Sequence, residues 1–445
     1  MLGECMIYKA SMFNHLCMID GEMVLYNSLT GSKGIRKVRK EDVEIVSEIL
    51  GKKEIPDSDL TMFHKLIEFG FVVDKDFDET LNRTRLQIQS ITDNALNLVI
   101  HTTKACNFRC KYCALDFPNE HMSLEVCDSI IKFIQKNISK YSSVHISWFG
   151  GEPLLKMDVI KYISSNVIEI CKRAKKPYFG SVTTNGYLLN PQNVSDLIEC
   201  KVWYYVVTID GIKETHDNQR VLQNGGATFD RIVDNLKYMS ENIKSHSLKV
   251  VIRTNITRDI YNKLDDYYDF FNRKFGDDSR YSLFIRPAGD WGGERVKLFL
   301  DNLIDESIMD RIFYQLSKRV GKIKYINNFL DLDFGGTSCK ATCFNKYTIG
   351  ADGMVSKCDT SDSELAIGRI DNGNLLIDSN KENLWVLGHR FNNPECNDCY
   401  YSFSCFGNSC PKAWVLYKAK SCPKENQIDS LITLYCQTYN VEYIR

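Results

Sequence analysis

The sequence predicts an α/β protein whose largest part is a partial (β/α)6 TIM-like barrel. Three observations lead to this prediction. Six strand-like runs alternate with helical patterns between residues 96 and 286, the first 80 residues mix short strands with helices, and the cysteine-rich residues 337–428 carry few helical patterns. A chain of 445 residues is also longer than one ordinary domain. We therefore expect three folded parts.

The composition excludes several classes of protein. Lys and Arg number 56 against 57 for Asp and Glu, so the chain has neither the basic field of a nucleic-acid-binding protein nor a polybasic membrane patch. The N-terminus lacks the basic stretch and apolar core of a signal peptide. No apolar run approaches the ~18 residues of a membrane span. We expect a cytoplasmic protein that binds neither nucleic acid nor membrane.

Residues 1–80 have the pattern of a small winged-helix-like domain. Three short strand-like runs open it, at residues 6–10, 15–19 and 23–26. The turn pair Asp20-Gly21 separates the last two runs. Two helical patterns follow, at residues 41–50 and 58–69, and Gly70 stands where a helix C-cap is expected.

The barrel is expected at residues 96–310. Residues 81–95 are polar without a hydrophobic period, which predicts a linker. The strand patterns beyond it cover residues 96–102, 144–148, 178–183, 202–208, 248–254 and 281–286. The clearest helical patterns cover residues 125–137, 159–172, 229–241 and 263–273. In such a barrel the functional side chains lie at the carboxyl ends of the strands.

Three further parts are expected after the barrel. Residues 311–336 bridge to a loop-rich domain at 337–428, and residues 429–445 form a C-terminal tail. Because cysteine, glycine and aromatic residues rise in 337–428 while helical patterns thin out, we expect bound metal rather than a large apolar core to hold this domain together.

The most informative segment follows the first barrel strand. Cys106, Cys110 and Cys113 stand in the spacing Cys-x3-Cys-x2-Cys. Four protein ligands close a structural metal site, whereas three thiolates leave one coordination position open for chemistry. A zinc site that takes His101 as its fourth ligand is the alternative for this segment.

With Tyr112 just before its third cysteine, this segment resembles the radical SAM superfamily. The resemblance implies a 4Fe–4S cluster held by three thiolates, with a fourth iron that binds the amino and carboxylate groups of S-adenosylmethionine. It further implies reductive cleavage of S-adenosylmethionine to a 5′-deoxyadenosyl radical, which takes a hydrogen atom from the substrate. A flavodoxin- or ferredoxin-like protein would donate the electron.

The ends of the later strands carry motifs that match this family. Gly150-Gly151-Glu152-Pro153 follows the second strand, where glycines allow close backbone approach and a carboxylate accepts from an ammonium group. On the resemblance, the residues expected to bind S-adenosylmethionine are Tyr112, Gly150, Gly151, Glu152, Pro153, Thr184, Asn185, Asp210 and Arg253. A bare turn at Thr184-Asn185, and a structural polar network around Asp210, are the alternatives.

Eight more cysteines lie between residues 339 and 422 and resemble the SPASM domain, which holds two auxiliary 4Fe–4S clusters. The resemblance assigns to the first cluster Cys339, Cys343, Cys358 and Cys410. It assigns to the second Cys396, Cys399, Cys405 and Cys422. If Cys339 does not ligate, the first cluster keeps an open iron. The gap before Cys410 is one residue longer than the family pattern, and two four-cysteine zinc sites are the alternative.

One carboxylate and six scattered cysteines complete the candidate residues. Asp359 directly follows Cys358, and in sulfatase-maturing relatives an aspartate at the matching position removes a substrate proton. A solvated loop aspartate is the alternative. The other cysteines are expected to be buried small hydrophobic residues: Cys5, Cys17, Cys127, Cys171, Cys200 and Cys436.

These resemblances predict a radical SAM/SPASM peptide maturase. The N-terminal domain resembles the peptide-recognition domain of such enzymes, which implies a ribosomally made precursor peptide with a leader segment and a thioether or carbon–carbon cross-link as product. The runner-up is a sulfatase-type maturase that forms formylglycine. That alternative is weakened because its members usually carry the cysteine triad near the start of the chain, whereas the triad begins here at Cys106. A zinc-ribbon binding protein and an iron–sulfur electron carrier are the alternatives without radical catalysis.

Overall fold

The computed structural model describes most of the chain. The described residues are 6–289, 294–304, 308–309, 311–312, 315, 332–333, 335, 339–360, 363–388, 393–405, 410–418, 422 and 428–445. Most of the expected bridging region 311–336, together with Cys5, therefore lies outside the described residues.

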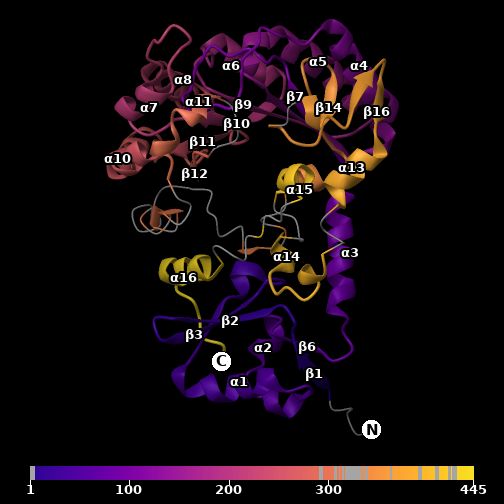
Figure 1. Ribbon diagram of the computed structural model, residues 1–445, viewed down its shortest axis with the longest axis vertical. Helices are drawn as coiled ribbons and strands as arrows, with labels where there is room; N and C mark the ends of the chain where they lie inside the picture. Colours follow the sequence, from indigo (N-terminus) through magenta and orange to yellow (C-terminus); the bar gives the residue numbers. More distant parts are fainter. Residues whose placement is uncertain are drawn as a thin grey trace.

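The N-terminal module (residues 6–78) contains two three-stranded sheets and lies at one end of the molecule (Figure 1). One sheet has the order β5-β1-β6, with β1 at Ile7–Ala10, β5 at Ile55–Pro56 and β6 at Val72–Asp74. The other has the order β2-β3-β4, with β2 at Asn14–Ile19, β3 at Glu22–Asn27 and β4 at Arg36–Val38. Asp20 and Gly21 join β2 to β3 with positive φ angles of 50° and 79°, as a tight hairpin requires.

Of the two helices expected in this module, one is confirmed and the other is much shorter than predicted. The first is α1 (Val43–Gly51), as the periodicity predicts. The second, expected at 58–69, is wrong as a continuous helix, because only α2 (Lys65–Glu68) is α-helical there. Leu60, Phe63 and Leu66 are buried at intervals of three residues, and backbone hydrogen bonds of 2.9 Å and 2.8 Å link them in tight turns.

The segment expected to be a featureless linker is helical. α3 (Glu79–Ile91) begins at Asp78, whose side chain accepts a 2.8 Å hydrogen bond from the backbone of Leu81. Its buried residues recur every fourth position: Glu79, Arg83, Gln87 and Ile91. Because three of these four are polar, the sequence carries no hydrophobic period. The helix runs from the N-terminal module to the barrel (Figure 1).

Six parallel strands form the barrel in their sequence order, which confirms the predicted fold class. They are β7 (Ala95–His101), β8 (Ser143–Phe149), β9 (Tyr178–Thr184), β10 (Val202–Thr208), β11 (Lys249–Ile256) and β12 (Tyr281–Pro287). The longer helices are α4 (Leu124–Asn137), α5 (Met157–Arg173), α6 (Pro191–Glu199), α8 (Phe229–Asn242) and α10 (Leu264–Phe275). Shorter ones are α7 (Lys213–Gln219), α9 (Arg258–Tyr261) and α11 (Glu294–Lys297).

The C-terminal region continues the barrel sheet, which the expectation of a loop-rich domain did not include. β13 (Lys346–Ile349) pairs in parallel with β7, and three antiparallel strands follow it. These are β14 (Met354–Ser356), β15 (Gly368–Asp371) and β16 (Asn374–Ile377). Helices α13 (Ser379–Val386), α14 (Ser402–Cys405) and α15 (Pro411–Tyr417) lie between the sheet and the N-terminal module (Figure 1).

The C-terminal tail returns to the N-terminal module. After α16 (Ile428–Thr438) the chain runs along β4, where the backbone N–H of Lys37 donates to Glu442 at 3.0 Å and that of Ile444 donates to Lys37 at 2.9 Å. The Ile444 side chain is fully buried in the apolar core of the module. The tail is therefore part of the N-terminal fold.

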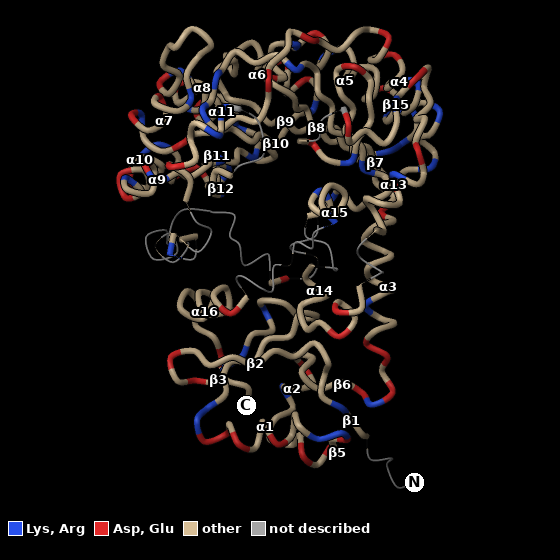
Figure 2. Tube along the Cα trace, viewed as in Figure 1, with Lys and Arg blue, Asp and Glu red and all other residues tan. Residues whose placement is uncertain are grey.

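Charge is distributed evenly over the described molecule. Figure 2 shows Lys and Arg interspersed with Asp and Glu around both the barrel and the N-terminal module. No helix in the described part of the chain is long and apolar enough to cross a membrane.

The position of α3 generates the first prediction. Arg83 donates from Nη1 to the backbone oxygens of Cys396 (2.8 Å) and Asn397 (2.6 Å). Replacing Arg83 by Ala should lower the free energy of unfolding by about 2 kcal/mol, because two charge-assisted hydrogen bonds from a buried guanidinium are lost. Thermal unfolding of the cluster-loaded protein measures this loss.

Arg85→Ala is the matched control, because Arg85 is exposed and its side chain bonds to Asn82 and Gln89 of its own helix. Its unfolding midpoint should stay close to that of the unchanged protein. Equal losses of unfolding free energy in the two variants would contradict the proposed link between α3 and the segment that contains Cys396.

Candidate active site

The loop that carries the three cysteines is fixed to the barrel by backbone hydrogen bonds. It leaves the carboxyl end of β7, and there the backbone N–H of Arg109 donates to Val221 at 2.8 Å while that of Lys111 donates to Gln219 at 3.0 Å. The partner residues are Gln219, the last residue of α7, and Val221 shortly after it. The cysteines are therefore placed by the main chain at the strand ends, where the sequence predicts them.

The two glycines of the motif after β8 pack against this loop. The backbone N–H of Gly151 donates to Thr103 at 3.0 Å, and that of Glu152 donates to Ala105 at 2.9 Å. A Cβ atom on Gly150 would lie 2.3 Å from the Thr103 oxygen, and one on Gly151 would lie 2.2 Å from the Ala105 oxygen. Both positions thus require glycine because the cysteine loop approaches so closely.

Glu152 is fully buried and joins the ends of two strands. Its Oε1 accepts hydrogen bonds from the Thr184 hydroxyl (2.7 Å) and the Leu154 backbone (3.1 Å), and its Oε2 accepts from the Asn185 backbone (2.8 Å). Burial raises the pKa of this carboxyl, while these hydrogen bonds act in the opposite direction. The structure therefore brings Glu152, Thr184 and Asn185 together, as the sequence predicts.

The hydroxyl of Tyr112 lies at the centre of a buried polar network. It donates to Asp210, accepts from Arg220 at 2.6 Å and accepts from Asn255 at 3.0 Å. Asp210 also accepts a 2.8 Å hydrogen bond from the Asn255 backbone and lies 3.8 Å from Arg220. Burial raises the pKa of Asp210 and the Arg220 charge lowers it. The network ties the cysteine loop to β10 and β11.

The three thiols lie near one another, because the charges of Cys110 and Cys113 both act on the pKa of Cys106. Burial raises the pKa of Cys106 to about 12, and the charge of Glu152 raises it further. Burial raises the pKa of Cys110 to about 11, while the Arg220 charge acts to lower it. The pKa of Cys113 is also raised, mainly by burial. A positively charged group held by the three sulfurs would remove this penalty, and three soft ligands with an open position fit an iron–sulfur cluster.

The first group of C-terminal cysteines is only partly assembled in the described structure. Burial raises the pKa of Cys339, and the negative charges of Cys358 and Cys410 raise it further, which places these three thiols near one another. The Lys346 ammonium lies close enough to act in the opposite direction. The Cys343 thiol instead lies 3.5 Å from the backbone oxygen of Ser90.

The second group of C-terminal cysteines lies around Arg83. Burial lowers the pKa of this guanidinium, whereas the negative charges of three of the predicted ligands raise it: Cys396, Cys399 and Cys405. Cys422 lies near Tyr400, whose pKa is raised mainly by burial and also by the charges of Cys399 and Cys422. A cation from α3 thus stands beside these thiols.

A cavity of about 240 Å³ opens between the cysteine loop and the C-terminal strands. Its walls include Gly150 and Gly151, the loop residues 114–118, and Asp359. The Asp359 carboxylate accepts from Lys346 at 2.5 Å and from Thr348 at 3.0 Å. His101 also lines the cavity, and burial lowers its pKa to about 4.

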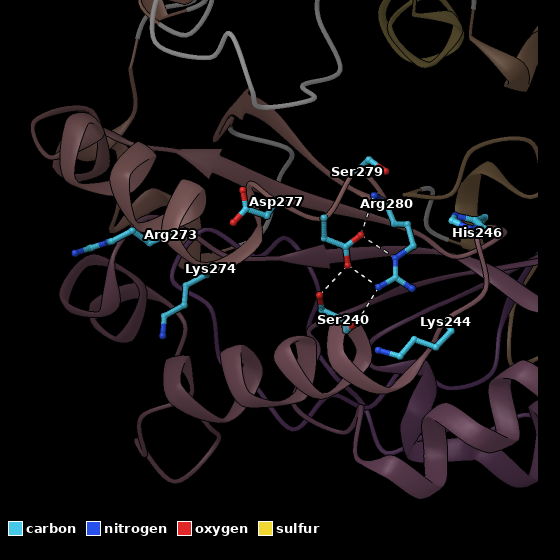
Figure 3. A pocket seen from close by; sticks show the side chains of 9 residues that line it. Ser240, Lys244, His246, Arg273, Lys274, Asp277, Ser279 and Arg280 are labelled. Carbon is cyan, nitrogen blue, oxygen red and sulfur yellow. Dashed lines mark hydrogen bonds and ion pairs between the residues drawn. The ribbon is translucent and has the colours of Figure 1, made fainter.

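A second hollow, of about 420 Å³, lies far from this chemistry. It sits at the amino end of β12, where Arg280 is held by Asp278 and by the backbone of Ser240 (Figure 3). Since catalytic groups of a parallel barrel gather at the carboxyl ends of the strands, we assign no catalytic role to it.

Sequence reasoning missed two cations beside the predicted sites, Lys346 and Arg83. Both are buried and both act from other elements than the cysteines they approach, so no local motif marks them. Arg253, predicted to bind the cofactor, donates from Nε to Asn255 at 3.1 Å and so adjoins the Tyr112 network.

Comparison with known proteins agrees with this geometry. Residues 100–267 match the model of the Radical SAM superfamily. The cysteine-type anaerobic sulfatase-maturating enzyme of Clostridium novyi is 24% identical over 68% of this chain and 84% of that protein. The serine-type enzyme of Bacteroides thetaiotaomicron is 22% identical over 69% and 80%. A solved structure of anSMEcpe with bound AdoMet covers 78% of this chain and 95% of its own, with 17% identity and a TM-score of 0.56.

Residues 100–267 thus form a radical SAM domain, which confirms the class of enzyme predicted from the cysteine triad. The fold is shared with anSMEcpe, and the relatives include two sulfatase-maturating enzymes, which agrees with the prediction of a maturase. A radical SAM domain implies a 4Fe–4S cluster and S-adenosylmethionine as cofactors.

The network around Tyr112 generates the second prediction. Tyr112→Phe removes the hydroxyl that bridges Asp210 and Arg220, so buried charged groups lose a partner. The free energy of unfolding should fall by roughly 1–3 kcal/mol, as measured by denaturant titration of the cluster-loaded protein.

Tyr205→Phe is the matched control within the same barrel. The Tyr205 hydroxyl is buried without a hydrogen-bond partner in the described part of the chain, so its removal should cost nothing or stabilise slightly. Similar losses in both variants would show that the Tyr112 network has no particular role.

Proposed function

We propose that this enzyme modifies a ribosomally made precursor peptide and forms an intramolecular thioether or carbon–carbon cross-link. The observation that carries the proposal is the cavity that joins the cysteine loop to Asp359. Its volume suits one peptide side chain. In the related anSMEcpe, a structure with bound AdoMet also contains the Kp18Cys peptide, with a TM-score of 0.53 to this chain.

The N-terminal module supports a precursor peptide as substrate. Three of its contacts reach the second cysteine group directly: Ser28 bonds to the Tyr400 backbone, the Tyr26 hydroxyl lies 3.0 Å from Ser404, and the rings of Phe13 and Phe403 lie 4.6 Å apart. A leader segment held by this module would keep the modified part of the peptide close to the catalytic end of the barrel.

Three clusters and one S-adenosylmethionine are the cofactors that we propose. Cys106, Cys110 and Cys113 would hold the cluster beside the cofactor, and the two C-terminal groups would hold auxiliary clusters. When bound, the first cluster and S-adenosylmethionine supply a 5′-deoxyadenosyl radical. The electron donor that we propose is a flavodoxin- or ferredoxin-like protein.

The protein's own residues would bind and orient S-adenosylmethionine and the substrate. We propose that Glu152 and the glycine loop hold the methionine amino group, with Thr184 and Asn185 beside it. Arg253 keeps four N–H groups besides the one bonded to Asn255, which suits a carboxylate. Asp359 would accept a substrate proton, because Lys346 and Thr348 orient one of its oxygens and the side chain is 42% exposed.

A sulfatase-type maturase is the second candidate, favoured by the two curated relatives and by Asp359. The products separate the candidates. A cross-link removes two hydrogens and keeps the cysteine sulfur, whereas formylglycine made from cysteine replaces that sulfur by oxygen. Mass spectrometry of each short peptide encoded beside the gene, after co-expression with this chain, decides between them.

The radical chemistry has a direct test. Anaerobically reconstituted protein should contain about twelve irons per chain, which is three 4Fe–4S clusters, and should form 5′-deoxyadenosine with dithionite and S-adenosylmethionine. Replacing the three residues Cys106, Cys110 and Cys113 by Ala should remove about four irons and abolish 5′-deoxyadenosine. Formation of 5′-deoxyadenosine by that variant would overturn the assignment of the triad.

The role of Asp359 is tested by its neutral analogue. Asp359→Asn should lower the rate of peptide modification by about 10²–10⁴-fold while 5′-deoxyadenosine still forms, because proton removal and radical formation are separate steps. Asp352→Asn is the control, since this carboxylate lines the same cavity but pairs with Lys104 at 2.9 Å. Full modification by Asp359→Asn would exclude it as the base.

A further inference from the structure

Three side chains of types that can bind a metal ion lie together where α16 meets the N-terminal module (Figure 1). His15 and Cys17 are alternate residues of β2, so both side chains are on one face of the strand. Asp429 lies in the first turn of α16, and its Oδ1 is 2.6 Å from Nε2 of His15. The ligand atoms of His15, Cys17 and Asp429 all lie within 4.8 Å of one another.

Cys436 of the same helix does not belong to this group. It stands seven residues after Asp429, which is about 10 Å along the helix axis, too far for both side chains to bind one ion. The group therefore offers three protein ligands and leaves the fourth position of a tetrahedral ion to water.

The expectation of buried small hydrophobic residues describes Cys127, Cys171 and Cys200, which are buried. Cys17 and Cys436 are only half-buried, although both pack against the main core. Cys17 also has an imidazole and a carboxylate as neighbours.

We propose that His15, Cys17 and Asp429 bind one zinc ion, which fastens α16 to β2. One thiolate, one imidazole and one carboxylate suit zinc with water in the fourth tetrahedral position, and the thiol proton leaves when the ion binds. The ring of Tyr400 stacks on His15 at 4.1 Å with an interplanar angle of 8°, which fixes the orientation of the imidazole. The site therefore joins both chain ends, and it is independent of the peptide that the enzyme modifies.

Elemental analysis and X-ray absorption test this site in the full-length, reconstituted protein. After passage over a chelator, about one zinc per chain should remain in addition to the iron. The zinc absorption edge should show one sulfur neighbour near ~2.3 Å and nitrogen or oxygen neighbours near ~2.0 Å. A zinc ion bound only by sulfur would instead mark a wrongly loaded cluster site and overturn the proposal.

Two variants localise the metal. Cys17→Ala and Asp429→Asn should each lower the retained zinc about tenfold or more and leave the iron content unchanged, and the second variant changes only a largely exposed side chain (69%). Cys171→Ala, in the buried face of α5, is the matched control and should keep both metals. Absence of zinc from the unchanged protein, unchanged zinc in both variants, loss of iron from Cys17→Ala, or a Cys17–Cys436 disulfide in anaerobic protein would each overturn the proposal.

Discussion

The arrangement of the catalytic end depends on the close backbone contact between the cysteine loop and the segment after β8. Two hydrogen bonds of 3.0 Å and 2.9 Å make this contact, and no side chain fits between the backbones at Gly150 or Gly151. Because the same contact sets the direction of the chain at Glu152, the carboxylate enters the interior and holds the end of β9. The loop, β8 and β9 therefore form one connected unit beside the proposed cofactor site.

The N-terminal module is joined to the rest of the chain by α3 and by the C-terminal tail. α3 carries Arg83 to the second cysteine group, and the C-terminal tail inserts Ile444 into the core of the module. A module held in this way cannot move without disturbing the segment at residues 396–405, which carries the second group of C-terminal cysteines. A structural change caused by binding of a peptide to the module would consequently reach the proposed auxiliary cluster through direct contacts rather than through a long linker.

The barrel could be predicted from the sequence because its strands are apolar runs that repeat with regular spacing. The turn at Asp20-Gly21 and the cysteine triad were equally local signals. α3 escaped prediction because its inward positions are filled by polar residues that meet distant partners, and β13 because its pairing with β7 spans some 250 residues of sequence. The Tyr112 network and the two buried cations arise from the same kind of distant contact, which no local pattern encodes.

Each predicted group of cluster ligands stands beside a cation from another element. Arg220 lies near Cys110, Lys346 near Cys339, and Arg83 near Cys396. Burial of such cations is costly unless negative charge compensates it, and protonated thiols supply none. Asp210 already lies beside Arg220 and Asp359 accepts from Lys346, whereas Arg83 donates to backbone oxygens and to the Asn397 side chain. A thiolate-bound cluster at the proposed second auxiliary site would supply negative charge beside Arg83, so binding of that cluster would favour the folded form of the loop around it.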